Sequence, residues 1–311
     1  MRRVITFIIL IGLWQSARAA DEARPNRPVP AIEQALIVSI DGLRPDVLLR
    51  TRSPRIHDLY EHGSFSFWAR TTALSTTLPS HTSMLTGLIP RRHEVEWNWD
   101  LPLAKPVYPR GQTLFEVAKK AGYSTAMAAG KSKFTILAKP GTIDWMWVPE
   151  TVQCEDNDVT EQAVQMILQH QPQVMFVHLP SNDNVGHAIG WGTPQQLAVV
   201  ENADACVGRL LDAMQESDVL RHTFVLITAD HGGAGAWHTP DDPRSRHIPW
   251  IATGPGIRQN LDLTTFDKLT INTEDTFATV CHLLAITYDR TIDGHPVTQI
   301  EERDELLRAD K

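Results

Sequence analysis

Cysteine is scarce in this sequence, and paired cysteine spacings are absent. Among the 311 residues only Cys154, Cys206 and Cys281 are cysteines, and no two of them form a CxxC motif. A small, odd count of this kind excludes a disulfide scaffold and a cysteine-ligated zinc site. One disulfide with one thiol left over stays open, provided that the chain reaches an oxidising compartment.

Positive charge is also in short supply. Lys and Arg number 29 against 37 Asp and Glu, which gives a formal net charge of −8. An acidic chain is poorly suited to bind phosphate backbones, so we expect no nucleic acid as a specific partner. With 42% hydrophobic and 21% charged residues, the composition excludes a disordered, collagen-like or coiled-coil chain.

Long hydrophobic runs are missing except close to the N-terminus. Arg2 and Arg3 precede an apolar run from Val4 to Trp14, and Ala17-Arg18-Ala19 follows as a small-x-small sequence. This pattern is typical of a secretory signal peptide, and the run is shorter than the about 20 residues that span a bilayer. We therefore predict a signal peptide over residues 1–19, a periplasmic or secreted protein, and no stable membrane span after cleavage. An uncleaved membrane anchor is the alternative.

After a polar lead-in over residues 20–34, which we expect to be flexible, the sequence alternates strand-like and helix-like segments. Continuous apolar runs predict buried strands at Ala35–Ile40, Thr125–Ala129, Val174–Val177, Thr223–Thr228 and Trp250–Ala252. Apolar residues at helical spacing predict helices at Gln112–Ala121, Asp158–Gln169, Pro194–Met214 and from Thr273 onward. This order predicts one domain over residues 35–311, a three-layer α/β/α sandwich with a mostly parallel central sheet.

Acidic residues and histidines follow three of the predicted strands. Asp41 follows the first strand, Asp183 and His187 follow another, and Asp230 and His231 follow a third. Each residue alone is compatible with a helix cap or a hydrogen-bonded turn. Together they would meet at the carboxyl ends of the strands, where like charges repel unless a cation neutralises them. Carboxylates and imidazoles without thiolates favour zinc or manganese.

A loop rich in Ser and Thr, residues 71–81, lies between the first two acidic positions. Such a segment is usually only a connection. A threonine hydroxyl beside a divalent cation, however, can lose its proton near neutral pH and act as a nucleophile.

Four ordered motifs resemble a known family. They are Ile37-Val38-Ser39-Ile40-Asp41-Gly42, then Thr77-Leu78-Pro79-Ser80-His81 with Leu85-Thr86-Gly87, then Asp183-x-x-Gly186-His187, and Thr228-Ala229-Asp230-His231-Gly232-Gly233. Their order resembles the alkaline phosphatase superfamily, and within it the nucleotide pyrophosphatase/phosphodiesterase branch, the type I phosphodiesterases. The resemblance runs from about Leu36 to Pro296.

The resemblance implies two divalent metal ions, with Zn²⁺ the expected identity. Asp41, Asp230 and His231 would hold one ion, to which the Thr77 hydroxyl would also bind. Asp183 and His187 would hold the other ion, together with a further histidine, either His238 or His247. The place of His238 relative to the Ile-Pro-Trp-Ile stretch favours His238.

The resemblance also implies a mechanism. Thr77 would attack phosphorus and form a covalent phospho-threonine, and Asn98, five residues after His93, would donate to the substrate phosphate. The expected activity is an exported two-metal hydrolase that cleaves phosphodiester or pyrophosphate bonds of a small phosphorylated substrate. Only Phe134 to Asp158 is available for a cap over the site, so we expect a minimal cap.

Other activities of the same superfamily stay open. A phosphomonoesterase or a phosphonate hydrolase is one alternative, and a non-catalytic metal-binding member is another. A sulfatase is disfavoured because the segment at Thr77 lacks the Cys/Ser-x-Pro/Ala-x-Arg motif. Lys131 and Lys133 would either meet an anionic substrate group or be solvated loop lysines. Trp145 and Trp147 would either stack on a leaving group or pack at an edge of the domain.

Overall fold

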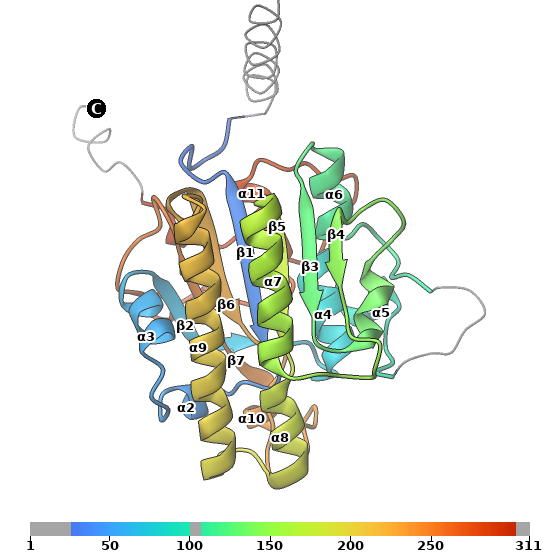
Figure 1. Ribbon diagram of the computed structural model, residues 1–311, viewed down its shortest axis with the longest axis vertical. Coiled ribbons are helices and arrows are strands. Elements are labelled where there is room, and N and C mark those ends of the chain that lie inside the picture. Colours follow the sequence, from blue (N-terminus) through green and yellow to red (C-terminus); the bar gives the residue numbers. More distant parts are fainter. Residues whose placement is uncertain (1–25, 100–106, 303–311) are drawn as a thin grey trace, which may run out of the picture.

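The computed structural model describes residues 26–99 and 107–302, and the predicted signal peptide lies outside these ranges. The described residues build one eight-stranded sheet in the order β4-β3-β5-β1-β6-β7-β2-β8 (Figure 1). The strands are β1 (Gln34–Ile40), β2 (Ser64–Arg70), β3 (Thr125–Ala129), β4 (Trp145–Trp147), β5 (Val174–Leu179), β6 (Thr223–Thr228), β7 (His247–Thr253) and β8 (Leu261–Asp262).

The sheet is parallel around its centre and antiparallel only at β7. β1 lies between β5 and β6 and is parallel to both, so that Val38 is paired with Val177 and with Ile227. β3 continues this arrangement with parallel pairing to β5 and to β4. β7 runs antiparallel to both of its neighbours, β6 and β2. The five strands predicted from apolar runs are therefore confirmed, and the carboxyl ends of the four parallel ones, β1, β3, β5 and β6, lie at one edge.

Helices cover both faces of the sheet, which confirms the three-layer α/β/α architecture (Figure 1). The helices are α2 (Pro45–Leu48), α3 (Pro54–Glu61), α4 (Thr77–Thr86), α5 (Pro90–His93), α6 (Leu114–Lys120), α7 (Asp156–His170), α8 (Ser181–Ile189), α9 (Pro194–Glu216), α10 (Pro243–Arg246) and α11 (Asp275–Leu283). Helices α3, α7 and α9 pack together on one face, and α4, α6 and α11 on the other. The four predicted helices correspond to α6, α7, α9 and α11.

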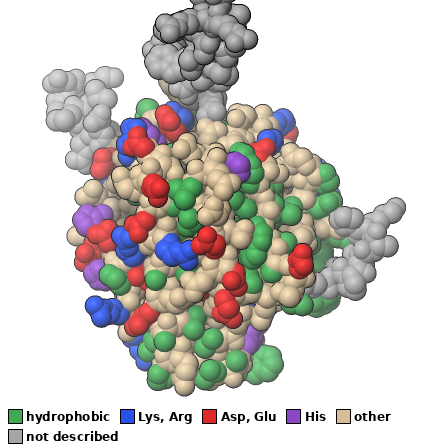
Figure 2. Space-filling view, viewed as in Figure 1, with side chains coloured by type: hydrophobic (Ala, Val, Ile, Leu, Met, Phe, Trp, Pro, Cys, Tyr) green, Lys and Arg blue, Asp and Glu red, His purple; other side chains and the backbone are tan. Residues whose placement is uncertain are grey.

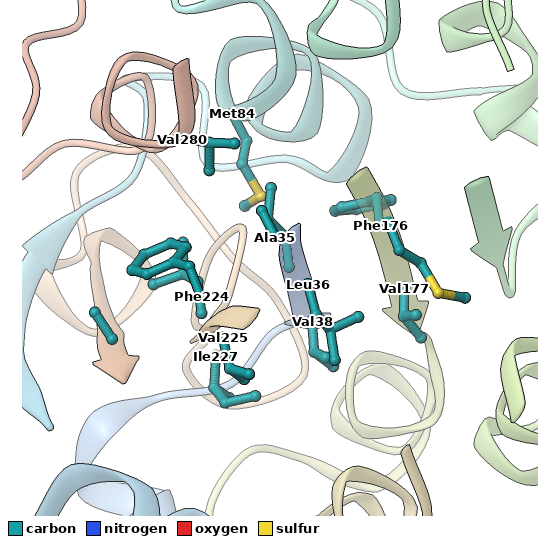
Figure 3. Close-up of a cluster of buried hydrophobic side chains, with 14 of the residues drawn as sticks. Ala35, Leu36, Val38, Met84, Phe176, Val177, Phe224, Val225, Ile227 and Val280 are labelled. Carbon is teal, nitrogen blue, oxygen red and sulfur yellow. The ribbon is translucent and has the colours of Figure 1, made fainter. Parts of the chain in front are cut away.

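The core lies between the central strands and both helix layers. Figure 3 shows Met84 of α4 and Val280 of α11 beside Ala35 of β1, with side chains of β5 and β6 on either side. These residues are 2% exposed or less. Burial of such large apolar side chains stabilises the fold by about 1.5–3 kcal/mol each, so the central strands provide a rigid base for whatever side chains follow them.

The lead-in differs from the sequence-based expectation. It was expected to be flexible, yet its described part packs on the domain, with Ile32 fully buried and Val29 8% exposed. The segment available for a cap contributes only a 3₁₀ helix (Ser132–Leu137) and edge strand β4, which agrees with the expected minimal cap. Both segments therefore contribute to the domain itself.

The surface of the face covered by α7 and α9 carries interspersed acidic and basic side chains (Figure 2). Within residues 26–99 and 107–302, no helix has the length and apolar character needed to cross a membrane.

Candidate active site

Three carboxylates meet at the carboxyl ends of the central strands. Asp41 follows β1 directly, Asp230 lies two residues after β6, and Asp183 lies in the first turn of α8, which follows β5. Because β1 lies between β5 and β6, the carboxyl ends of these strands lie side by side, at the lower end of the sheet in Figure 1 next to α8, and the three residues that follow them lie close together. Asp41 and Asp230 are fully buried and Asp183 is 4% exposed.

Asp41, Asp230 and His231 form one candidate metal site. The Nε2 atom of His231 lies 3.4 Å from Asp41 Oδ1 and 3.3 Å from Asp230 Oδ2. Two ligands at about 2.0–2.1 Å from a tetrahedral zinc ion lie about 3.3–3.4 Å from each other, so these atoms have the spacing of zinc ligands. All three atoms are buried and have no hydrogen-bond partner within the described chain. The residues present therefore fit a divalent cation.

A second candidate site lies beside the first. Ligand atoms of Asp183, His231 and His238 all lie within 4.8 Å of one another. The Nε2 atom of His187 lies 3.4 Å from Asp183 Oδ1, and the His187 and His238 rings are 5.0 Å apart. The structure thus brings His187 and His238 to Asp183, while His231 lies between the two sites and stacks on His238 at 4.0 Å.

Backbone carbonyls orient two of these imidazoles. Nδ1 of His231 lies 2.9 Å from the carbonyl oxygen of Gly232, and Nδ1 of His187 lies 2.9 Å from that of Ala236. A carbonyl oxygen only accepts, so each Nδ1 donates and each Nε2 keeps its lone pair. Burial also lowers the pKa of His238 to about 3. Neutral imidazoles held in this way are typical of metal ligands.

Trp191 is a supporting residue that the sequence analysis did not identify. Its Nε1 donates to the carbonyl oxygen of Gly42 at 2.8 Å, and its ring lies 5.1 Å from that of His187. A Cβ atom at Gly186 or Gly233 would lie closer to the Trp191 ring than real Cβ atoms approach. Glycines of two separate motifs, Gly186 and Gly233, therefore make room for one indole ring, a relation that only the folded chain reveals.

Lys131 lies within the cluster and is not a solvated loop lysine. Its side chain is 7% exposed, and its Nζ donates to Asp41 Oδ2 and to Asp183 Oδ2, each at 2.7 Å. Burial opposes the charge of Lys131, but the carboxylates of Asp183 and Asp41 outweigh it and raise the pKa of Lys131. The direction of its side chain could not be deduced from the sequence alone.

The surroundings shift the pKa values of these carboxyl groups in different directions. Burial would raise the pKa of Asp41, but Lys131 and the hydrogen bond from His178 Nε2, at 2.9 Å, hold it well below its usual value. Burial, together with repulsion from Asp41 and Asp183, raises the pKa of Asp230 well above its usual value. Such strongly perturbed carboxylates concentrate at functional sites.

Thr77 is the first residue of α4 and is 1% exposed. His81, one turn later, holds this end of the helix in place. Its Nδ1 donates to the Thr77 carbonyl oxygen at 2.8 Å and lies 3.4 Å from Asp230 Oδ2. The amino terminus of α4, where backbone N–H groups favour negative charge, is therefore next to the first candidate metal site.

Asn98 lies against the same end of α4. Its Oδ1 accepts from the backbone N–H of Leu78 at 2.9 Å and from Lys133 Nζ at 3.0 Å. Both partners are donors, so they fix the orientation of the amide, and its Nδ2 is a donor without a hydrogen-bond partner among residues 26–99 and 107–302. Burial, with the nearby Lys131 charge, lowers the pKa of Lys133 to about 8. His93 anchors this segment through Ser83, with its Nε2 3.0 Å from the Ser83 hydroxyl.

Two residues weighed in the sequence analysis lie outside the cluster. His247, the alternative last ligand, stacks on the exposed Trp68 at 4.0 Å and belongs to neither candidate metal group of the described residues. Trp145 stacks on His170 at 4.4 Å, on the edge strand β4.

Comparison with known proteins agrees with this geometry. The sequence model of the family described as type I phosphodiesterase / nucleotide pyrophosphatase matches residues 35–242. The chain belongs to this family. The matched range includes every candidate ligand from Asp41 to His238, and the resemblance predicted from the four motifs is confirmed.

Curated relatives of this chain are distant. An uncharacterized pyrophosphatase/phosphodiesterase of Schizosaccharomyces pombe is 23% identical over 64% of the chain and 44% of its own length. Human ectonucleotide pyrophosphatase/phosphodiesterase family member 5 is 22% identical over 65% of the chain and 45% of its own length. The chain thus spans less than half of the length of these relatives.

Solved structures share the fold. Murine ectonucleotide pyrophosphatase/phosphodiesterase 5 superposes with a TM-score of 0.71 at 16% identity, over 86% of this chain and all of the other. A second structure of that murine protein is an inactive variant, in which a threonine is replaced by alanine, in complex with AMP. A putative sulfatase from Bacteroides thetaiotaomicron gives a TM-score of 0.70 at 17% identity, over 88% of this chain and 76% of its own.

Proposed function

We propose that this type I phosphodiesterase is an exported two-metal hydrolase that cleaves phosphodiester or pyrophosphate bonds of small phosphorylated substrates. The observation that carries the proposal is a set of buried ligand atoms without hydrogen-bond partners in the described chain. They are Asp41 Oδ1, Asp183 Oδ1, Asp230 Oδ2, His231 Nε2 and His238 Nδ1. Unpaired buried polar atoms are costly, and cations would remove that cost.

The two ions would be held by different residues. Asp41, Asp230 and His231 would hold one ion, and Asp183, His187 and His238 the other. Zn²⁺ suits this set of oxygen and nitrogen ligands. When bound, the ions would neutralise the carboxylates, lower the pKa of the nucleophile and stabilise charge on the attacking and departing oxygens.

The chain itself would supply the nucleophile and the phosphate donors. Thr77 Oγ1 would form a bond to phosphorus while the bond from phosphorus to the leaving-group oxygen breaks, and water would then hydrolyse the phospho-threonine. The Nδ2 atom of Asn98, which has no partner in the described part of the chain and whose orientation Leu78 and Lys133 fix, would donate to a non-bridging oxygen of the phosphate. Preorganised donors of this kind stabilise the transition state without reorganisation during the reaction.

A nucleotide is a reasonable test substrate because a structural neighbour was solved with AMP. Phosphomonoester hydrolysis is the second candidate activity, since the Lys133 ammonium beside Asn98 places a cation where a dianionic phosphoryl group would need one. Parallel hydrolysis of bis-p-nitrophenyl phosphate and p-nitrophenyl phosphate by the zinc-loaded protein separates the two. A tenfold preference corresponds to about 1.4 kcal/mol.

The nucleophile is tested by Thr77→Ala. We expect this variant to lose turnover of both substrates while its zinc content stays near that of the unmodified protein. Thr76→Ala is the matched control, because Thr76 precedes the helix and its side chain makes no capping hydrogen bond. Undiminished hydrolysis by Thr77→Ala would exclude Thr77 as the nucleophile.

The last ligand is tested by comparing His238→Ala with His247→Ala. We expect His238→Ala to lose about one zinc ion per chain and His247→Ala to keep both, as measured by elemental analysis after dialysis. The reverse pattern would assign the ligand to His247.

A further inference from the structure

Lys131 joins the two candidate metal sites. Its Nζ is 2.7 Å from Asp41 Oδ2, in one site, and 2.7 Å from Asp183 Oδ2, in the other. The opposite oxygens, Asp41 Oδ1 and Asp183 Oδ1, are the ones that lack hydrogen-bond partners in the described residues. Each carboxylate thus presents one oxygen to the lysine and the other to the space between the ligands.

Lys131 is also the main source of positive charge at this place. The other groups within ion-pair distance of Asp41, Asp183 and Asp230 in the described residues are histidines: His81, His178, His187 and His231. A lysine ammonium carries a full positive charge at neutral pH, whereas an imidazole that serves as a metal ligand is neutral. Among the described residues, therefore, the ammonium in direct contact with the buried acidic cluster is that of Lys131, while the Lys133 ammonium acts on the same carboxylates from beyond ion-pair distance.

We propose that Lys131 is an internal counter-ion that allows the chain to fold before its metal ions arrive, and that weakens the binding of those ions in return. The inference rests on the proposed metal sites. Burying several carboxylates without compensation is strongly unfavourable. Lys131 and the metal ions neutralise the same carboxylates. Lys131 therefore lowers the affinity for the metal ions, and the bound ions lower the contribution of Lys131 to stability.

This antagonism has a thermodynamic consequence. Coupling between two sites is reciprocal: if Lys131 lowers metal affinity, metal binding lowers the contribution of Lys131 to stability by the same free energy. A lysine that served only in packing would contribute equally with and without metal. A lysine that served only to orient ligands would raise metal affinity. The three roles are therefore distinguishable.

The experiment compares the unmodified protein with Lys131→Met, each in zinc-loaded and chelator-treated form. We expect Lys131→Met to lower the Tm of the metal-free protein more than that of the loaded protein. We also expect zinc affinity, measured by chelator competition, to increase at least tenfold. An equal loss of Tm in both forms, or a decrease in affinity, would overturn the inference.

Lys139→Met is the matched control. Lys139 is also partly buried and paired with a carboxylate, with its Nζ 2.9 Å from Glu116 Oε2, but it contacts none of the metal ligands. We expect this substitution to change the Tm by the same amount with and without zinc.

A double variant covers the case in which Lys131→Met does not fold without metal. Removing one carboxylate together with its cation, in Lys131→Met/Asp183→Asn, should restore metal-free folding, which we would follow by circular dichroism. No restoration would overturn the counter-ion role. If zinc does not change the Tm of the unmodified protein, the proposed metal sites are wrong. The counter-ion role of Lys131 is then still decided by whether the double variant folds without metal.

Discussion

At the scale of single residues, the chemistry available to the site depends on which polar atom of each side chain already has a hydrogen-bond partner. The orientation of Asn98 follows from the two donors that meet its Oδ1, Leu78 N–H and Lys133 Nζ. The same reasoning gives His187 and His231 free Nε2 atoms. Residue types and spacings predicted the members of the site, but only contacts across the fold show which face of each member is available.

Asn98→Ala removes the proposed phosphate donor. We expect kcat/KM for bis-p-nitrophenyl phosphate to fall about 10²–10³-fold, the usual effect of losing one donor to a developing anion. The free energy of unfolding should fall by about 0.5–2 kcal/mol, because the backbone N–H of Leu78 at the start of α4 loses its acceptor. Asn202→Ala, on α9, is the control and should keep full activity. A loss below threefold for Asn98→Ala would remove the donor from the mechanism.

Asp156 is buried behind the site at the start of α7, and burial raises its pKa to about 6. Its Oδ1 accepts from the Ser181 backbone N–H at 2.8 Å, whereas its Oδ2 has no partner in the described residues. A carboxyl group has a pKa of about 3.9 when unfolded. The folded chain therefore holds this proton more tightly, and the associated stability is present at low pH and lost as pH rises through about 6.

The prediction concerns the difference between two pH profiles of the zinc-loaded protein. Between pH 4 and pH 7, the stability of the Asp156→Asn variant relative to the unmodified protein should increase, by up to about 3 kcal/mol. Urea unfolding at several pH values measures it. Parallel profiles would show that Asp156 does not titrate in this range.

At the scale of elements, α4 is confined at both ends. His81 holds its amino terminus, and Gly87 ends it in the left-handed region at φ 69°. The Gly87 carbonyl oxygen also accepts from the backbone N–H groups of Asp293 and Gly294. The position of Thr77 therefore depends partly on how the opposite end of the same helix is fixed.

Gly87→Ala should be more destabilising than Gly122→Ala. A Cβ atom at Gly87 would lie 2.9 Å from Phe277 and 3.0 Å from Ile292, whereas Gly122, at φ 85°, has open space around it. Left-handed strain costs each variant about 1–2 kcal/mol, and overpacking adds about 1–3 kcal/mol at Gly87. Urea unfolding measures both losses. Equal losses would mean that Phe277 and Ile292 move aside for the new methyl group without a loss of stability.

The strands also show which parts of the fold the sequence alone predicts and which it does not. Buried parallel strands such as β1 and β6 are continuous apolar runs, so their sequences reveal them directly. β2, Ser64–Arg70, has alternating burial and contains serines, and it was not predicted. The reversed direction of β7 and the inward path of Lys131 depend on contacts with distant parts of the chain, which a single sequence does not display.

At the scale of the whole molecule, the cohesion of the described domain does not come from disulfides. Cys154, Cys206 and Cys281 are all free thiols, and Cys206 and Cys281 are buried. One disulfide was left open by the sequence, and the structure contains none among these three residues. Burial raises the pKa of Cys206 to about 11, so its reactive thiolate form is rare at neutral pH.

A reducing agent should therefore leave the fold unaffected. We expect the Tm of the zinc-loaded protein to be the same with and without tris(2-carboxyethyl)phosphine, and titration with a thiol reagent under denaturing conditions to find three thiols per chain. A Tm that falls on reduction would reveal a disulfide.

The reversed direction of β7 has one more consequence. Because β6 ends and β7 begins at the same edge of the sheet, the connection between them, residues 229–246, lies at that edge and carries the candidate ligands Asp230, His231 and His238. Lengthening such a connection costs little loop entropy, about 0.6 kcal/mol for each doubling. It also leaves every strand register unchanged. Residues inserted after His238, the last candidate ligand in this connection, would therefore add a wall beside the proposed substrate site and leave the strands and the spacing of the ligands unchanged.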